Sequence, residues 1–305
     1  MWSFRQTRVF MDTAVTVEVV DDAESEGGEA ASERAFGWFE QVEALCSRFD
    51  PDSELRRLSA RPGEAVEVSP LLFEAVRFAV AVARASRGAF DPTVGARMEE
   101  YGFDRNYRTG VAARAGQAAD PQGSWRDIHL DGRRRTITLR RPVLLDLGAV
   151  AKGLAADLAM RELDGFSGCA VDAGGDVAVR GRSSSGQPWR IGIRHPRQPG
   201  ALCTAVCLHE GAVCTSGDYE RRARAPSGGS HLLDPRRGAP ASEVASCTVV
   251  APQAMMADAL GTAASVLGPG PAIAWLERQG VEAVLYSPAM ERFATPGFGR
   301  LEQCP

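Results

Sequence analysis

The residues with the most specific chemistry lie near the C-terminal end of the chain, in the segment Met256-Ala-Asp-Ala-Leu-Gly-Thr262. On a helix, Asp258 and Thr262 are one turn apart and share a face, with their side chains about 5–6 Å from each other. Their carboxylate and hydroxyl oxygens are hard ligands suited to Mg²⁺, although two ligands are too few to hold the ion alone. The segment therefore predicts part of a magnesium site. The alternative is an aspartate that bonds backbone groups near the helix start.

One lysine stands out because nearly all the basic residues are arginine. The chain has 35 basic residues, and since Lys152 is its one lysine, the other 34 are arginine. Lys152 follows Asp146 in the segment 145–153, where a strand is expected to turn into a helix. A positive charge near a helix N-terminus opposes the helix dipole, so a bound anion would explain Lys152; the alternative is a lysine on a solvated face. Asp146, at the strand end, either bonds a ribose hydroxyl or caps the turn.

Two further segments combine polar residues with turn-forming residues. His231 and Asp234 lie three residues apart before a proline. A turn can therefore bring an imidazole and a carboxylate together, as in proton transfer; the alternative is a structural histidine. The paired glycines of residues 171–177 either let backbone amides approach a ligand or mark a bulge, and the bulge is favoured. The chain has no G-x-G-x-x-G or Walker motif, so the usual nucleotide-binding folds fit it poorly.

The elements that must position these residues follow from apolar periodicity and from start and stop signals. Residues 9–20 alternate and predict an opening strand, and a helix is expected over about 30–46. Ser69, Pro70 and Gly88 mark the start and end of the next helix. The remaining expectations are an Asp-Gly hairpin over 128–139, a helix over 151–163 that ends before a glycine, strands over 169–181, 189–196 and 203–215, and consecutive helices over 251–267 and 268–280.

The order of these elements bears on fold class and domain organisation. Strands and helices alternate irregularly, which favours an α+β fold over a doubly wound parallel sheet. With 305 residues, the chain is expected to form one large domain or two closely joined lobes. Residues 112–123 have no periodicity and predict an exposed connector, the candidate boundary between two lobes.

Composition excludes several classes of protein. No apolar run approaches the roughly 20 residues of a membrane-spanning helix. The net charge of −4 offers no electrostatic reason to expect nucleic acid or an anionic membrane as a partner. The first nine residues lack the apolar region of an export signal, and the seven cysteines include no C-x-x-C pair. We therefore expect reduced thiols and a cytoplasmic location.

Taken together, these segments resemble the FAD:protein FMN transferase family, also called the ApbE or thiamine-biosynthesis lipoprotein family. The resemblance runs through nearly the whole chain, because eight short motifs occur in the same order at compatible spacings. Each motif is weak alone. They are Phe10-Met-Asp-Thr13, residues 46–55, residues 88–94, residues 146–153, Ala173-Gly-Gly-Asp176, Thr215-Ser-Gly-Asp-Tyr219, His231-Leu-Leu-Asp-Pro235 and Ala257-Asp-Ala-Leu-Gly-Thr262.

The resemblance implies a fold, a reaction and a set of site residues. The implied fold is α+β, with mixed or antiparallel sheets and packed helices in an ApbE-like (T-fold-like), two-lobed single unit over residues 1–305. The implied reaction is the Mg²⁺-dependent transfer of the FMN moiety of FAD to a Thr or Ser hydroxyl of an acceptor flavoprotein, with release of AMP. The implied roles are metal binding by Asp258, Thr262 and the carbonyl of Ala149; FAD binding by Met11, Phe49, Asp91, Asp146, Lys152, Leu232 and Leu233; and proton acceptance by His231.

Two positions depart from the family pattern, and they affect the expected affinity. The family usually has Gly where this chain has Asp12, and Tyr where it has Phe49. Phe keeps the stacking face and loses one hydrogen bond, so FAD binding is expected with altered affinity. Asp12 would repel a dianionic pyrophosphate unless it points away. Many members act outside the cytoplasm, so the expected location of this chain is a further difference.

Two other functions are compatible with the same residues. One is an FAD pyrophosphatase, in which water replaces the acceptor hydroxyl and the products are FMN and AMP. The other is a non-catalytic FAD-binding protein. The presence of Lys152, His231, Asp258 and Thr262 together argues against the second, because binding alone would not require all four.

Overall fold

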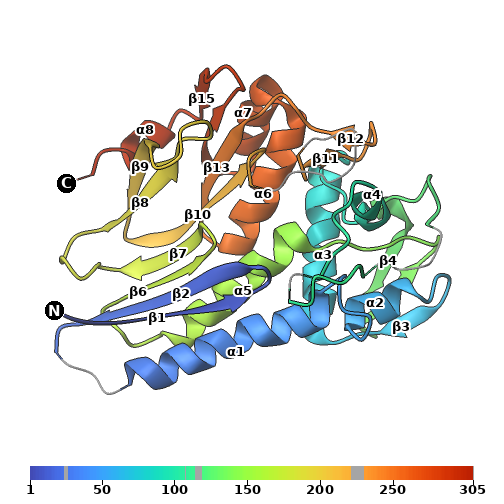
Figure 1. The fold of residues 1–305 in the computed structure, drawn as a ribbon, viewed down its shortest axis with the longest axis horizontal. Coiled ribbons are helices and arrows are strands. Elements are labelled where there is room, and N and C mark those ends of the chain that lie inside the picture. The colour runs from blue at the N-terminus through green and yellow to red at the C-terminus, as the bar shows by residue number, and fades with distance from the viewer. Residues whose placement is uncertain (24–26, 107, 114–118, 221–229, 305) are drawn as a thin grey trace.

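A long antiparallel sheet forms the centre of the molecule (Figure 1). The computed structural model describes residues 1–23, 27–106, 108–113, 119–220 and 230–304. Within these ranges, eight strands pair antiparallel along the sheet. In spatial order they are β1 (Trp2–Phe10), β2 (Thr13–Asp21), β6 (Gly168–Ala173), β7 (Asp176–Gly181), β10 (Glu210–Gly217), β13 (Ser246–Ala251), β14 (Glu282–Tyr286) and β15 (Arg292–Ala294).

Period-two burial explains how both faces of this sheet are covered. In β10, Ala212 and Cys214 belong to the larger core, whereas Val213 between them belongs to a second core on the opposite face. The larger core contains the helices α1 (Gly28–Cys46), α5 (Gly148–Glu162), α6 (Ala254–Leu267) and α7 (Pro269–Arg278). The second core is closed by the hairpin of β8 (Trp189–Arg194) and β9 (Leu202–Leu208) and by α8 (Phe298–Leu301).

A smaller sheet lies beside the large one, to its right in Figure 1. Its strand order is β3 (Ala65–Glu67), β5 (Thr136–Leu139), β4 (Ile128–Asp131). The helices α2 (Glu54–Ser59), α3 (Pro70–Ala85) and α4 (Gly95–Glu100) surround it, together with the short turn η1 (Trp125–Asp127). A two-stranded ribbon, β11 (Leu233–Asp234) and β12 (Ala239–Pro240), stands between α4 and α7. The antiparallel sheets and packed helices confirm the expected α+β class.

The signals read from the sequence around α3 are confirmed. The Ser69 hydroxyl accepts a hydrogen bond from the Leu72 amide at 3.3 Å, and Pro70 is the first helical residue. After α3 ends, Arg87 and Gly88 both adopt positive φ, at 55° and 82°. The end of α3 also receives a bond from α7, because the indole of Trp275 donates to the carbonyl of Ala85 at 3.1 Å. Local signals therefore defined this helix correctly.

Two expectations about strands are wrong. Residues 9–20 are not one strand, because the chain reverses at Met11 and Asp12, between β1 and β2. The paired glycines do not form a bulge but the two-residue turn of the β6–β7 hairpin, with φ of 71° at Gly174 and 99° at Gly175. Alternation of side chains continues through a two-residue turn, so period-two patterning alone does not reveal the reversal. The Asp-Gly hairpin over 128–139 is confirmed as β4 and β5.

The expected connector at 112–123 falls inside the region that builds the smaller sheet. The strands of this sheet come from residues 65–139, on both sides of the connector. Residues 114–118 of the expected connector lie outside the described residues. Among the described residues of the connector, the amide of Asp120 donates to the carbonyl of Pro142 at 2.7 Å. This bond holds the end of the connector against the segment that follows β5. A single unit with a lobe boundary at this connector stays a prediction.

The cysteines differ from the expectation of reduced thiols. Cys207 in β9 and Cys304 near the C-terminus form a disulfide across 97 residues of sequence. The two cysteines of this disulfide are distant in sequence, and only the tertiary fold brings them near each other. Five other cysteines are free, among them Cys46, whose pKa burial raises to about 12.

The helices also bear on membrane association. In the part of the chain that the structure describes, no helix combines the length and the apolar character that crossing a bilayer requires.

Candidate active site

One cavity of about 770 Å³ collects the residues that the sequence singled out. Its volume is within the usual range of pockets for small molecules and cofactors. Its walls come from segments spread between residues 11 and 262. All eleven predicted site residues line it: Met11, Phe49, Asp91, Asp146, Ala149, Lys152, His231, Leu232, Leu233, Asp258 and Thr262. The fold thus brings the whole predicted set to one place.

The β1–β2 turn forms one end of this cavity. Met11 and Asp12 adopt φ of 50° and 63°, in the left-handed region that glycine adopts most easily. Asp is among the side chains that tolerate this region best, which explains how the chain keeps the turn without the glycine of the family pattern. The Gly174 turn packs against the same hairpin: a Cβ at Gly174 would stand 2.0 Å from the Thr13 hydroxyl. Two tight turns therefore set where Met11 lies.

Three charged residues form what we call the Lys152 cluster: Lys152, Asp176 and Asp258. The Lys152 ammonium donates to Asp176 Oδ2 at 2.5 Å and to Asp258 Oδ2 at 2.8 Å. Both carboxylates have 7% of their side-chain surface exposed, and Lys152 has 24%. Burial opposes the lysine charge, but the attraction of Asp176 and Asp258 outweighs it and raises the pKa of Lys152. The two aspartates therefore stabilise a charged lysine near the helix start, and a bound anion beside it stays a prediction.

Close helix packing creates the Lys152 cluster. A Cβ at Gly153 of α5 would lie 2.4 Å from the backbone of Met255 in α6, so glycine permits the approach of the two helices. The Asp157 carboxylate accepts hydrogen bonds from the amides of Ala254 and Met255 at 2.7 and 3.0 Å, and it satisfies the start of α6. Burial raises the pKa of Asp157, and these two bonds oppose that rise.

The three predicted metal ligands all carry oxygen atoms that could bind a metal, and all three residues line the same cavity. Asp258 and Thr262 lie one turn apart on α6, as the sequence predicts. Ala149 departs from helical geometry inside α5, with φ −91° and ψ 15°, which turns its carbonyl away from the regular helix direction. Among the described residues, no group of three or more His, Cys, Asp or Glu side chains is arranged to hold a metal ion. Mg²⁺ is commonly bound through one or two carboxylates with other oxygens, so this donor set fits it.

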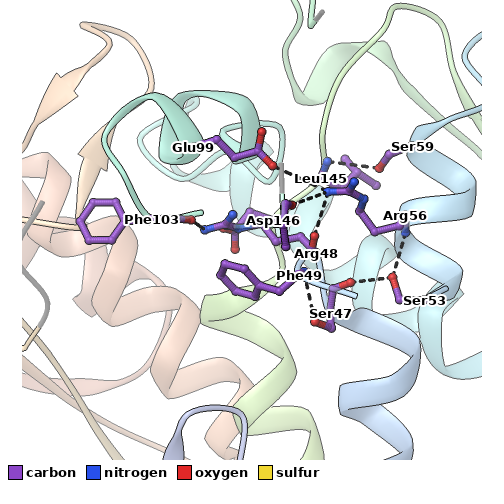
Figure 2. Close-up of polar contacts among 11 residues, drawn as sticks. Ser47, Arg48, Phe49, Ser53, Arg56, Ser59, Glu99, Phe103, Leu145 and Asp146 are labelled. Carbon is purple, nitrogen blue, oxygen red and sulfur yellow. Dashed lines mark hydrogen bonds and ion pairs between the residues drawn. The ribbon is translucent and has the colours of Figure 1, made fainter. Parts of the chain in front are cut away.

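A second group of residues, which we call the Arg48 cluster, lines another part of the cavity: Arg48, Phe49, Phe103 and Asp146 (Figure 2). Arg48 Nε donates to Asp146 Oδ2 at 2.6 Å, and Nη2 donates to the carbonyl of Phe103 at 2.5 Å. The guanidinium carbon lies 4.0 Å from the centre of the Phe49 ring. The other oxygen of Asp146 accepts from the Gly148 amide at 2.7 Å, so this aspartate does cap the turn before α5.

Asp91 lies at the cavity wall with its carboxylate engaged by the protein. Oδ1 accepts bonds from the amide and the hydroxyl of Thr93, at 2.9 and 2.7 Å, and Oδ2 accepts from the Trp125 amide at 3.2 Å. Burial raises the pKa of Asp91, and these hydrogen bonds oppose the rise. Its observed contacts join the loop after α3 to η1.

His231 and the two leucines stand at the wall nearest Phe103. The imidazole meets the Phe103 ring edge to face, with ring centres 6.4 Å apart. Leu232 and Leu233 are buried, with 5% and 6% of their surface exposed. The expected partner of the imidazole is otherwise engaged, because Arg236 binds both oxygens of Asp234, at 2.9 and 3.0 Å. An arginine two residues along the chain satisfies Asp234 locally, which the His-to-Asp spacing did not anticipate.

Sequence reasoning gave no role to two residues that the structure places at the centre of these contacts. Asp176 was visible only as the last residue of a Gly-Gly motif, yet it shares the Lys152 ammonium with Asp258. Arg48 was visible only as one of many arginines. The signal available was its position directly before Phe49, but nothing in the sequence showed that Asp146 would lie opposite it, 98 residues away.

The fold and the cavity define an α+β protein whose cavity is lined by the β1–β2 turn, by residues of α1, α4, α5 and α6, and by β11. The ApbE family model matches residues 11–285, and the chain therefore belongs to the ApbE family. It is 32% identical to an FAD:protein FMN transferase of Treponema pallidum, over 96% of this chain and 87% of that protein. It is 29% identical to the enzyme of the same name from Haemophilus influenzae, over 90% of this chain and 84% of that protein.

Solved structures agree with this assignment. An ApbE protein from Thermotoga maritima superposes with a TM-score of 0.87 at 27% identity, covering 99% of this chain and 100% of the other. The apo form of the flavinyl transferase ApbE from Pseudomonas stutzeri superposes with a TM-score of 0.83 at 28% identity, covering 99% and 97%. The resemblance read from eight short motifs is confirmed.

Proposed function

We propose that this chain is a Mg²⁺-dependent FAD:protein FMN transferase that moves the FMN moiety of FAD to a Thr or Ser hydroxyl of an acceptor flavoprotein and releases AMP. The observation that carries the proposal is the single cavity lined by all eleven predicted residues. Membership of the ApbE family and the names of the relatives support the flavin transfer.

The Lys152 cluster is the proposed site of the metal and the pyrophosphate. Asp258, Thr262 and the carbonyl of Ala149 would hold Mg²⁺, which when bound neutralises charge on the non-bridging phosphate oxygens. Lys152 keeps its proton at any ordinary pH, because Asp176 and Asp258 raise its pKa. Its ammonium holds two carboxylate oxygens in place, at 2.5 and 2.8 Å, and presents positive charge to the cavity. This part of the site orients the oxygens of the phosphoanhydride.

His231 is the proposed proton acceptor for the attacking hydroxyl. An alcohol is a weak nucleophile, so a base within hydrogen-bond reach assists its attack on phosphorus. The proton leaves the hydroxyl oxygen for the imidazole as the bond to the FMN phosphorus forms, and the phosphoanhydride bond breaks with its electron pair on the departing AMP. The ring lies at the cavity wall against Phe103, beside the buried leucines 232 and 233, which exclude water from one side. Met11, Phe49, Asp91 and Asp146 would complete the FAD contacts.

The test uses purified full-length chain with FAD and Mg²⁺, with and without an acceptor domain that carries a Thr or Ser site. We expect covalent flavin fluorescence on the acceptor in a denaturing gel and one AMP per flavin transferred. Chelation of the metal should remove both. The matched control is His231→Gln, which should retain FAD binding, measured by quenching of flavin fluorescence, and lose transfer.

The same experiment separates the other functions. Free FMN and AMP formed at equal rates with and without acceptor would show an FAD pyrophosphatase. Bound FAD with neither product would show a binding protein. Absence of flavin binding after incubation with FAD would contradict all three functions.

The partners and the location follow from the proposal. FAD and an acceptor flavoprotein are the expected partners, and neither nucleic acid nor a membrane span is required. A cytoplasmic location stays a prediction, and the Cys207–Cys304 disulfide bears on it, because disulfides persist mainly in oxidising compartments. Mass spectrometry of the protein from its native cell, with free thiols alkylated before unfolding, distinguishes a reduced from an oxidised pair.

A further inference from the structure

Arg48 is the most deeply buried charge in the cavity wall to which no role has been given. It has 4% of its side-chain surface exposed, less than Asp146 with 16% and Lys152 with 24%. It nevertheless lines the ligand cavity. Removing a guanidinium from water is costly unless hydrogen bonds compensate, so the position of Arg48 demands a reason.

The hydrogen bonds of Arg48 join three separate segments. Arg48 belongs to the loop after α1, Phe103 to the loop after α4, and Asp146 to the loop before α5. Nε and Nη2 bind Asp146 and the Phe103 carbonyl at 2.6 and 2.5 Å, and the flat face of the same group covers the Phe49 ring (Figure 2). One planar group thus fixes a carboxylate, a loop and an aromatic ring together.

The third nitrogen argues against a role in stability alone. Among the described residues, Arg48 Nη1 is shielded from solvent and has no hydrogen-bond partner. A buried donor without an acceptor destabilises the folded state. The fold tolerates this cost at a residue whose planar shape orders the cavity wall, and an unsatisfied buried group in a native structure calls for such an explanation.

We propose that Arg48 is a positioning residue for the dinucleotide: it holds the Phe49 ring and the Asp146 carboxylate in the orientation that receives an aromatic ring system of FAD and its adjoining ribose. This inference rests on the proposed function. Arg48 acts through Phe49 and Asp146, so its loss should weaken FAD binding more than it slows the transfer step. Lysine cannot replace it, because one ammonium does not bind two acceptors and also cover a ring face.

The experiment measures FAD affinity of Arg48→Lys by quenching of flavin fluorescence, in the absence of acceptor. We expect Kd to rise about 10- to 30-fold, the size of one or two lost charge-assisted hydrogen bonds. With saturating FAD, kcat for transfer should stay within about threefold, because the phosphate end is unchanged. Arg48→Gln, which is uncharged and shorter, should raise Kd at least as much and provides a second variant if the lysine variant does not fold.

Arg56→Lys is the matched control. Arg56 is partly buried, with 12% of its side chain exposed, and donates to the carbonyl of Arg48 at 3.0 Å, but it does not line the cavity. It should lower the urea midpoint of unfolding and leave the Kd for FAD within about twofold. An equal rise in Kd in both variants would show a merely structural role and overturn the proposal.

A double-mutant cycle tests the route. If Arg48 acts through Asp146, then Arg48→Lys in an Asp146→Asn background should raise Kd by less than about threefold. If the two residues act independently, their effects on Kd should multiply. The outcomes also separate this inference from the proposed function. FAD binding that depends on Arg48 without transfer would keep the inference and contradict the transferase. Transfer with an unchanged Kd in Arg48→Lys would contradict the inference alone.

Adenosine and riboflavin, tested as competitors of FAD, identify which ring meets Phe49. The competitor whose own affinity falls in Arg48→Lys marks the end of FAD that this wall receives. If neither loses affinity, the wall does not position a ring, and the proposal is overturned.

Discussion

The two charged clusters of the cavity both contain an ion pair, but they differ in net charge. In the Lys152 cluster, one ammonium meets two carboxylates, so the local charge is −1 (one positive and two negative groups). In the Arg48 cluster, one guanidinium meets one carboxylate, a carbonyl and a ring, so the local charge is zero. A net negative site favours a cation, whereas a neutral one with an aromatic face favours an uncharged ring. This difference is what the proposed function requires, because FAD has phosphates at its centre and uncharged rings at its ends.

The residue types match this difference. Lysine is a compact point charge that fits between the two aspartates, and arginine is a rigid plane that binds acceptors at its edge and stacks at its face. The composition strongly favours arginine, with 34 against one lysine. The single lysine lies between two carboxylates, where one compact ammonium donates to both.

The largest expected effect comes from removing the carboxylate that the two helices bring to the Lys152 cluster. Asp258→Ala should lower the transfer rate about 1000-fold, because it removes the proposed metal ligand and leaves the charge of the cluster at zero. The FAD Kd, measured without metal, should change less than about fivefold. Calorimetry with Mg²⁺ provides the second measurement, and unchanged binding of the ion would show that Asp258 is not a ligand.

The next effect tests whether helix packing creates the Lys152 cluster. Gly153→Ala places a methyl group 2.4 Å from the Met255 backbone and should lower the free energy of unfolding by about 1–3 kcal/mol. The control is Gly37→Ala in α1, where an added Cβ meets nothing within 4 Å. This substitution should raise the free energy of unfolding by about 0.5–1 kcal/mol. Urea unfolding checks both values. If Gly153→Ala changed the free energy of unfolding in the same direction as Gly37→Ala, α5 and α6 would need no close approach.

Lys152→Arg gives the Lys152 cluster the guanidinium that is found in the Arg48 cluster. The charge is kept, but a planar fork replaces a point charge between Asp176 and Asp258, and it should extend into the cavity. We expect the Kd for FAD to rise about 10-fold, the equivalent of about 1.4 kcal/mol. Arg161→Lys, on the last turn of the same helix, is the control. Wild-type affinity in Lys152→Arg would show that only the charge matters there.

The smallest effect concerns the aromatic face of the Arg48 cluster. Phe49→Tyr restores the hydroxyl usual in the family and keeps the ring beneath the guanidinium. The Kd for FAD should fall by no more than about threefold, the value of one weak neutral hydrogen bond. Fluorescence titration detects this change, and a loss of affinity would show that the wall has no room for the hydroxyl.

Prediction from sequence succeeded where the signal was local. The Ser69-Pro70 start of α3 and the one-turn spacing of Asp258 and Thr262 depend on neighbours within a few residues. It failed where alternation concealed a reversal, as at Met11 and Asp12, and where a distant partner decided the outcome, as for Cys207. His231 was placed correctly at the cavity, but its supposed partner Asp234 was not, because Arg236 is nearer in the chain and binds both carboxylate oxygens.

The sequence by itself determined the family, the fold class and eleven of the residues that line the cavity. These features depend on residue types and on their spacing along the chain, and both can be read directly from the sequence. Only the tertiary structure decided the partners of those residues. Lys152 meets Asp176 and Asp258 across 24 and 106 residues of sequence, and Arg48 meets Asp146 across 98. The physical reason is that ion pairing acts over a few ångströms of space and therefore depends on how the helices and loops pack, not on their separation along the chain.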